Sequence, residues 1–216
     1  MAAPARIAVL ASGRGSNLQA ILDAIAGGRL DAEIAGVFGD RPDAVALTRV
    51  APELAWSRDA RSYPDRAAFD AELADAVAAS RPDWVVLAGY MRVLGHAFLS
   101  RFHGRVLNIH PSLLPAHRGL RTHARAIAAG DAEHGASVHF VVPELDAGAV
   151  IAQARVPVLP GDTADALAAR VLELEHPLLV GVLRLAVAGR IAERGATAEL
   201  DGHALFTPLQ LGSTLD

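Results

Sequence analysis

The feature that most limits the fold is a series of short apolar runs, each followed by a stretch with helical spacing. Residues 7–11 (Ile-Ala-Val-Leu-Ala) and 84–88 (Trp-Val-Val-Leu-Ala) contain only apolar side chains, a pattern typical of strands buried on both faces. Residues 17–26 and 65–80 place apolar side chains on one helical face. This alternation predicts an α/β fold, a Rossmann-like and mostly parallel twisted sheet with helices on both faces.

The pattern changes after about residue 110. Two alternating strands are expected around a turn at residues 146–148, followed by a long helix over residues 163–189. Pro177 is expected to bend or interrupt that helix, because proline lacks an N–H and clashes with the preceding turn. The tail from Arg190 predicts a small hairpin with Asp201-Gly202 as its turn. The two alternating strands are residues 136–142 and 149–158. The remaining expected elements are strands at residues 34–38, 54–56 and 105–109, and a short helix at residues 43–50.

Composition excludes several classes of protein. The 216-residue chain is 52% hydrophobic and 20% charged, which allows a sizeable core and excludes a disordered chain. The chain has no cysteine, and all 20 residues counted as lysine or arginine are arginine. Disulfides, thiolate nucleophiles, lysine Schiff bases and a Walker P-loop are therefore excluded.

Charge and hydropathy also bear on partners and location. The net charge of -4 gives no general attraction to nucleic acid or to an anionic membrane. The longest apolar stretch, residues 177–189, contains Arg184 and is too short to span a bilayer. The first apolar run is too short for the apolar region of a signal peptide. We expect a cytoplasmic protein with no membrane or nucleic-acid partner, and the sequence leaves a homodimer open.

A glycine-rich loop separates the first expected strand from the first expected helix. Gly13 and Gly15 would let backbone N–H groups approach an anion at the positive end of that helix. Leu18 occupies the place of the third glycine of a dinucleotide fingerprint, so one phosphate is favoured over a pyrophosphate. The alternative is an ordinary tight turn capped by Ser16 or Asn17.

Three polar residues suggest a catalytic site. Asn108 and His110 point to the same side at the carboxyl end of a buried strand, where open α/β sheets bind their ligands. Asp146 lies in a turn beside a strand that carries Ser137 and His139. An amide donor, a histidine and a carboxylate can stabilise an oxyanion and move a proton. The alternative is that Asn108 and His110 cap the loop backbone and Asp146 is an ordinary turn residue.

A metal site is a competing hypothesis. It would bring Asp146 together with four histidines: His110, His117, His123 and His139. None of these has the helical spacing that makes a metal site predictable, so we expect no metal.

Five motifs occur in the order found in a known family. They are ASGRGSNLQAI (residues 11–21), LAGYMR (87–92), LNIHPSLLP (107–115), GASVH (135–139) and ELDAG (144–148). Together they resemble the folate-dependent phosphoribosylglycinamide formyltransferases of purine synthesis, over the chain from Ile7 to about Phe206. The resemblance implies a formyltransferase that uses 10-formyltetrahydrofolate as co-substrate and 5'-phosphoribosylglycinamide as acceptor.

The resemblance also implies roles for individual residues. Asn108 and His110 would stabilise the tetrahedral oxyanion, and Asp146 would orient or charge the histidine and help proton transfer through water. The other implied residues are Gly13, Arg14, Gly15, Ser16 and Asn17 for the ribonucleotide phosphate, Glu175 and Arg170 for the glycinamide and ribose, and Arg66, Met91, Arg92, Val93, Leu94, Asn108, Val141 and Asp146 for the folate. Without the resemblance, Arg66 would be a solvated helix charge and Glu175 a surface carboxylate. A single domain over residues 1–216 is expected, with a phosphate-binding half up to about residue 105 and a folate-binding, catalytic half after it.

The sequence departs from the family at three places and leaves rival functions open. Arg118 and Ala149 stand where the family usually has proline, and Gly39-Asp40 replaces Ser-Asn. These changes bear on loop geometry and substrate preference. The rivals are a 10-formyltetrahydrofolate hydrolase, a formyltransferase for another amine such as methionyl-tRNA, and a non-enzymatic mononucleotide-binding protein.

Overall fold

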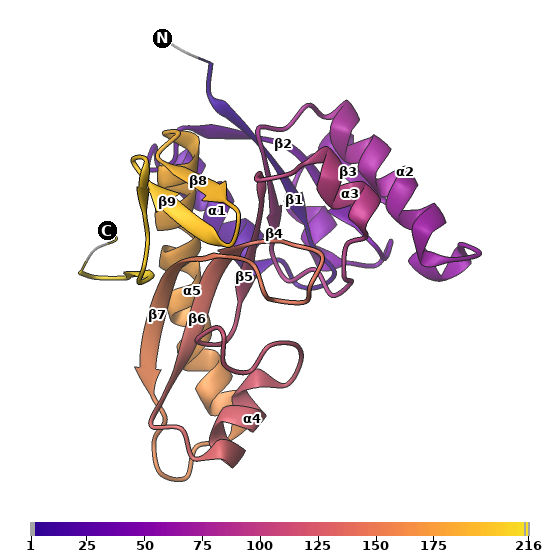
Figure 1. The fold of residues 1–216 in the computed structure, drawn as a ribbon. Coiled ribbons are helices and arrows are strands. Elements are labelled where there is room, and N and C mark those ends of the chain that lie inside the picture. Colours follow the sequence, from indigo (N-terminus) through magenta and orange to yellow (C-terminus); the bar gives the residue numbers. More distant parts are fainter. Residues whose placement is uncertain (1–2, 214, 216) are drawn as a thin grey trace. The chain divides into compact units, whose positions relative to one another are not determined.

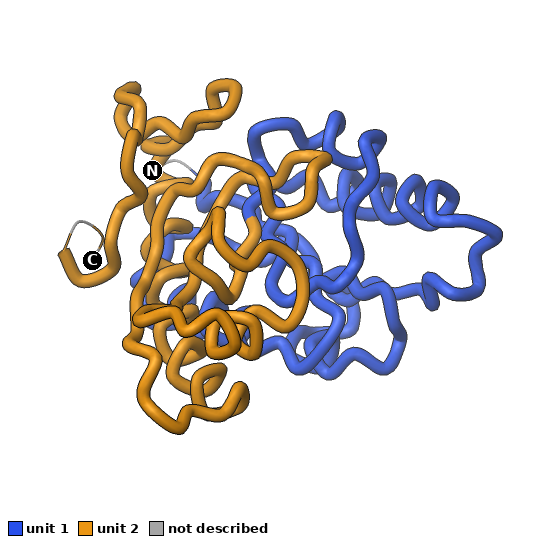
Figure 2. Tube along the Cα trace, turned by 60° about the horizontal axis from the view of Figure 1, so that its bottom comes forward, with its two compact units in different colours: residues 1–107 blue, residues 108–216 orange. Residues whose placement is uncertain are grey.

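A computed structural model describes residues 3–213 and residue 215. The chain divides into two compact units, residues 1–107 and residues 108–216, which Figure 2 colours blue and orange. Each unit is described by itself below.

The first unit contains a parallel sheet built around β1 (Ala5–Leu10). β1 pairs with β2 (Ala32–Gly39) on one side and β4 (Trp84–Leu87) on the other, and β2 pairs with β3 (Ala55–Ser57). Residues 7–11 have no exposed surface, which explains the continuous apolar run. The helices of this unit are α1 (Ser16–Ala26), α2 (Arg66–Ala79) and α3 (His96–Arg101), with short 3-10 helices at Val45–Arg49, Pro52–Leu54 and Ala60–Ser62.

The second unit is built on an antiparallel pair of strands. β6 (Glu133–Phe140) pairs with β7 (Val150–Pro157), and β11 (Leu209–Gln210) runs parallel to β7. The long helix α5 (Ala164–Val187) packs against both β6 and β7, as Figure 1 shows. The other elements are α4 (Thr122–Ala129), β8 (Ile191–Arg194), β9 (Thr197–Leu200) and β10 (His203–Ala204). β5 (Val106–His110) begins in the first unit and ends in the second.

The predicted fold class and most predicted elements are confirmed. The caps explain two helix starts, since Asp65 accepts a hydrogen bond from the Ala68 N–H and Thr163 accepts one from the Ala166 N–H. α5 continues through Pro177, so the interruption that the prediction allowed for does not occur. Residues 178, 179, 182 and 183 of this helix have no exposed surface, and their packing offsets the cost of the proline.

One further prediction about the elements was wrong, and two other regions contain more than was predicted. The expected helix at residues 43–50 is a five-residue 3-10 helix, Val45–Arg49. The predicted hairpin of the tail is confirmed, with Asp201-Gly202 as the turn between β9 and β10, and β8 extends it to a three-stranded antiparallel sheet. α3 and α4 were not predicted, because helices of six and eight residues are too short to show a helical period.

The close approach of β6 to β7 depends on Gly135. A Cβ atom at this position would lie 1.9 Å from the carbonyl oxygen of Ala154, so the two backbones would have to separate. We expect Gly135→Ala to lower the free energy of unfolding by about 3 kcal/mol or more, measured by urea unfolding. Gly161→Ala is the control, because its Cβ would contact nothing and only its positive φ of 82° opposes the change. Equal effects of the two substitutions would contradict the packing assigned to Gly135.

Candidate active site

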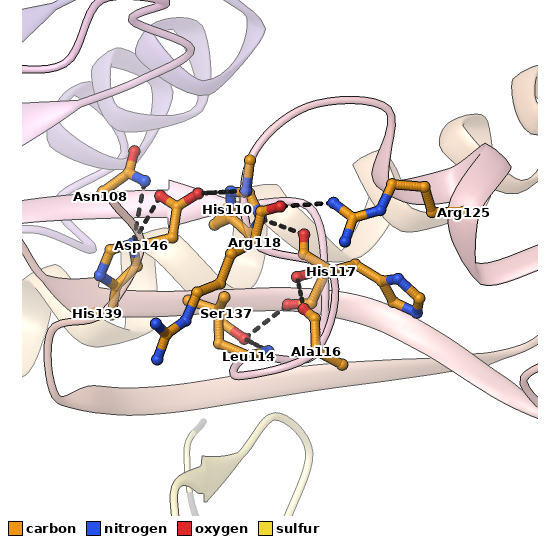
Figure 3. Close-up of polar contacts among 12 residues, drawn as sticks. Asn108, His110, Leu114, Ala116, His117, Arg118, Arg125, Ser137, His139 and Asp146 are labelled. Atoms are coloured by element: carbon orange, nitrogen blue, oxygen red, sulfur yellow. Dashed lines mark hydrogen bonds and ion pairs between the residues drawn. The ribbon is translucent and has the colours of Figure 1, made fainter. Parts of the chain in front are cut away.

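The second unit brings the three predicted catalytic residues together. Asn108 and His110 lie on the last three residues of β5, and His110 is only 6% exposed. Asp146 lies in the loop between β6 and β7, where its φ of 48° is in the left-handed region that aspartate tolerates better than most residues. Its side chain is 10% exposed. Three polar side chains therefore meet at the carboxyl end of β5 in a largely buried environment (Figure 3).

His110 has a defined hydrogen-bonding arrangement. Its Nε2 atom lies 3.2 Å from the carbonyl oxygen of His117, which can only accept, so Nε2 carries a proton. Its Nδ1 atom lies 3.4 Å from Oδ2 of Asp146. That contact is attractive only when Nδ1 also carries a proton, because a neutral ring would present a lone pair to the carboxylate. The Asp146 carboxylate is therefore placed where it can accept a hydrogen bond from a proton on Nδ1.

His139 orients Asn108, a role that the sequence did not reveal. The Nδ1–H of His139 donates to the carbonyl oxygen of Phe140 at 2.7 Å, which leaves Nε2 to accept from the Nδ2 amide of Asn108 at 3.1 Å. Burial lowers the pKa of His139 to about 4, so the ring is neutral and can accept at neutral pH. The second N–H of the Asn108 amide is then available to another acceptor. The sequence did contain a signal for this role, because Ser137 and His139 are two residues apart on one strand and therefore point to the same side of it.

A buried polar network fixes the loop that follows His110. Ser137 on β6 donates to the carbonyl oxygen of Ser112 at 2.7 Å and accepts from the Leu114 N–H at 3.0 Å. Gln153 on β7 donates to the carbonyl oxygen of Leu114 and to Ser137. These bonds tie residues 112–114 to the β6–β7 pair, and the Leu114–Pro115 peptide bond in this loop is cis. The loop is thus held by buried hydrogen bonds, which support the position of His110.

Only two of the four histidines of the metal hypothesis approach Asp146, namely His110 at 3.4 Å and His139 at 3.8 Å. The other two have different partners, since His123 Nδ1 lies 3.1 Å from His134 Nε2 and His117 Nε2 lies 2.5 Å from Asp131 Oδ2. Among the described residues, no group of three or more histidine, aspartate or glutamate side chains is placed to hold a metal ion. The residues that the structure describes therefore offer no set of side chains to support the metal hypothesis.

The buried histidines predict a loss of stability in acid. Burial lowers the pKa of His134 from its ordinary value of 6.5 to about 4. The unfolded chain therefore binds more protons than the folded chain between these values, and the free energy of unfolding falls as the pH falls through that range. Between about pH 7.5 and pH 5 we expect wild type to lose about 2 kcal/mol more than His134→Gln, measured by urea unfolding. Equal losses in the two proteins would contradict a neutral His134.

The glycine loop opens the first helix of the first unit. Gly15 precedes α1 with a φ of 73°, and a Cβ there would lie 2.7 Å from the Cβ of Ala46. Arg49, which the sequence did not single out, donates from Nε to the carbonyl oxygen of Arg14 and from Nη1 to Gln19. Ser12 Oγ accepts from the Met91 N–H at 2.9 Å, so this loop lies beside the segment predicted to bind folate.

The predicted folate-binding residues of the first unit lie in a second cluster. Met91 and Val93 are exposed, whereas Leu94 is buried. The guanidinium of Arg92 lies over the Phe69 ring at 5.1 Å. Asp70, which the sequence did not single out, pairs with Arg66 at 3.4 Å and accepts from the Gly95 N–H at 2.9 Å. Arg66 is therefore paired rather than only solvated.

The residues assigned to the glycinamide differ in their surroundings. Glu175 is 9% exposed on α5, which excludes an ordinary surface carboxylate. Arg170 donates to both carboxylate oxygens of Asp162 and to the carbonyl oxygen of Pro157. These bonds tie the first turns of α5 to the preceding loop. Val141 is half-buried in the same loop as Asp146.

Comparison with known proteins shows the family. The formyl transferase family matches residues 5–183, and the chain belongs to this family. The phosphoribosylglycinamide formyltransferase of Escherichia coli strain K12 is 46% identical over 201 residues, which cover 92% of this chain and 95% of that protein. The solved structure of the Coxiella burnetii phosphoribosylglycinamide formyltransferase superposes with a TM-score of 0.89 at 44% identity, covering 96% of this chain and 99% of that one.

A relative with another activity is less similar. The formyltetrahydrofolate deformylase of Pseudomonas syringae is 27% identical with a TM-score of 0.83, and the match covers 91% of this chain and 66% of that one. The predicted resemblance is therefore confirmed, and the hydrolase alternative has less support than the transferase.

Proposed function

We propose that this enzyme transfers the formyl group of 10-formyltetrahydrofolate to the amine of 5'-phosphoribosylglycinamide, giving formylglycinamide ribonucleotide and tetrahydrofolate in the synthesis of purines. The observation that carries the proposal is the buried contact of 3.4 Å between His110 and Asp146, with Asn108 on the same strand. It occurs in a chain that is similar over nearly its whole length to phosphoribosylglycinamide formyltransferases.

The reaction needs stabilisation of one negative charge and movement of one proton. When the amine attacks the formyl carbon, the formyl oxygen becomes an oxyanion, and the N–H of Asn108 that does not bind His139 can donate to it. The Nε2–H of His110 can also do so, because an oxyanion is a stronger acceptor than the His117 carbonyl, which it binds at 3.2 Å. Asp146 keeps the His110 ring charged and oriented, and a water can carry the proton from the attacking amine to the departing folate nitrogen.

The binding residues are part of the same proposal. The loop of Gly13, Arg14, Gly15, Ser16 and Asn17 binds the ribonucleotide phosphate at the start of α1. The glycinamide and ribose contact Glu175 and Arg170. The folate contacts Arg66, Met91, Arg92, Val93, Leu94, Val141 and the Asn108 and Asp146 side chains.

The location and the partners of the enzyme are part of the same proposal. None of the described helices combines the length and apolar character needed to cross a membrane. We propose a single functional domain in the cytoplasm that needs no metal, acts on small molecules rather than nucleic acid, and is able to form a homodimer.

The proposal is tested by tetrahydrofolate release from 10-formyltetrahydrofolate with and without 5'-phosphoribosylglycinamide. Release that requires the ribonucleotide supports the transferase. Equal release without it would establish the hydrolase, and no release in either case would contradict both activities and favour a binding protein.

A further inference from the structure

A short backbone segment, residues 117–119, contacts both members of the acid–base pair. The carbonyl oxygen of His117 accepts from His110 Nε2 at 3.2 Å, and the N–H of Gly119 donates to Asp146 Oδ2 at 2.8 Å. His110 and Asp146 contact each other at 3.4 Å through Nδ1 and the same Oδ2 atom. The bridging segment, as we call residues 117–119, therefore closes a ring of three polar contacts around the pair (Figure 3).

The residue at the centre of the bridging segment anchors it to two other elements. Arg118 Nη1 donates to Glu144 Oε1 at 3.1 Å, and Glu144 lies two residues before Asp146. The carbonyl oxygen of Arg118 accepts from Arg125 Nη1 on α4 at 2.6 Å. The Arg118 side chain is 40% exposed and that of Glu144 is 75% exposed, so neither fills the core.

The backbone of this region adopts conformations that need such anchoring. His117 and Arg121 have φ values of 54° and 57°, which are unfavourable for residues with a Cβ. Gly119, between them, has a φ of 80°. A loop with several left-handed residues keeps one conformation only when contacts outside the loop hold it, and Arg118 supplies a side-chain contact of that kind.

We propose that Arg118 is a positioning residue for the formyl transfer. Its ion pair with Glu144 holds the bridging segment so that the His117 carbonyl fixes His110 Nε2 and the Gly119 N–H fixes Asp146. This inference rests on the proposed function of the pair. Arg118 needs no contact with either substrate in this role.

Kinetics of the purified enzyme test the ion pair. An exposed ion pair changes an equilibrium constant by a factor of about five at most. Arg118→Gln is therefore expected to lower kcat about three- to fivefold, with little change in the KM of either substrate. Glu144→Gln is expected to lower kcat by the same factor, and the double variant Arg118→Gln with Glu144→Gln is expected to lower it no further. The exchanged pair, Arg118→Glu with Glu144→Arg, is expected to have a higher kcat than either of its single substitutions. Arg118→Lys keeps a positive charge and is expected to keep most of the activity.

Two controls are matched to these changes. Glu133→Gln removes an ion pair with Arg155 that has the same 3.1 Å length and a similar exposure, and it is expected to leave kcat unchanged. Gly119→Ala and Gly130→Ala both place a Cβ at a positive φ, yet only Gly119 lies on the ring, so only Gly119→Ala is expected to lower kcat, by about tenfold. A raised KM in Arg118→Gln that Glu144→Gln does not reproduce would overturn the inference, because it would mean that Arg118 binds a substrate.

A readout without turnover separates this inference from the proposed function. The Nε2–H proton of His110 can be observed by NMR with 15N-labelled histidine and assigned by its loss in His110→Asn. It is expected to be protected from exchange in wild type, Arg118→Lys and Glu133→Gln. In Arg118→Gln it is expected to exchange with solvent and broaden. An unchanged signal in Arg118→Gln would overturn the positioning role. A wild-type enzyme that shows the signal but transfers no formyl group to 5'-phosphoribosylglycinamide would instead overturn the proposed function.

Discussion

Asp146→Asn is expected to lower kcat about a thousandfold while the protein stays folded. The carboxamide has the same shape as the carboxylate and can still accept from the Gly119 N–H, so the loop keeps its contact. The negative charge beside His110 Nδ1 is lost, because the neutral amide oxygen that accepts from the Gly119 N–H is also the atom that faces Nδ1. His110 would then be held less well as a charged ring, and its Nε2–H would stabilise the oxyanion less.

Steady-state rates with each substrate varied measure this effect. The KM for the ribonucleotide is expected to change little, because the residues proposed to bind its phosphate are residues 13–17 and do not include Asp146. Asp201→Asn is the matched control, since Asp201 has a similar φ of 51° and an ion pair with Arg190 outside the site. A kcat within tenfold of wild type for Asp146→Asn would contradict the assigned role of Asp146.

Asn108→Ala is expected to lower kcat by a factor of about 100 to 1,000, the usual cost of removing one donor to an oxyanion. Asn108 is fixed by its bond to His139, so its remaining N–H does not have to be reoriented during the reaction. The free energy of unfolding is expected to fall much less than the activity, because one side-chain hydrogen bond contributes about 1 kcal/mol.

Ser137→Ala separates this catalytic effect from a structural one. Ser137 is buried on β6 and bonds to the loop after His110 without reaching the catalytic trio. We expect that substitution to lower the free energy of unfolding by about 1–3 kcal/mol and kcat only slightly, measured by urea unfolding and initial rates. A similar loss of kcat in both variants would mean that Asn108 acts only through the structure of the loop.

The sequence predicted that Asn108, His110 and Asp146 act together because each residue carries a local signal. Asn108 and His110 are polar residues at the end of an apolar strand, and Asp146 lies in a turn with alternating strands on both sides. The burial of β1 and β4 was likewise visible as uninterrupted apolar runs. Such signals can be read from neighbouring residues, because a strand alternates its side chains between two faces and because burying a polar group costs free energy.

The contacts that organise the site have no such local signal. Which nitrogen of His110 is protonated depends on the His117 carbonyl, and the Asn108 amide is oriented by a histidine 31 residues away. The loop conformation at residues 117–121 depends on Glu144 and on α4, a helix too short to be predicted. The same applies to Asp70 and Arg49, whose contacts become visible only when separate segments are brought together by the fold.

α5 shows the opposite case, in which the local effect of a proline on the helix was outweighed by packing. A proline inside a helix costs about 3 kcal/mol, and this predicted a bend or an interruption at Pro177. The apolar residues that follow it are buried against β6 and β7, and their packing keeps the helix continuous. Glu175 consequently lies on a buried turn of a continuous helix.

The central claim is that Asn108, His110 and Asp146 serve transfer of a formyl group to the amine of a phosphorylated glycinamide. It is tested most directly by supplying 10-formyltetrahydrofolate labelled with 13C in the formyl group and following the label by mass spectrometry. We predict that the label appears in the ribonucleotide, one formyl group for each tetrahydrofolate formed, and that Asp146→Asn abolishes most of this transfer. Labelled formate in solution with an unmodified ribonucleotide would contradict the claim.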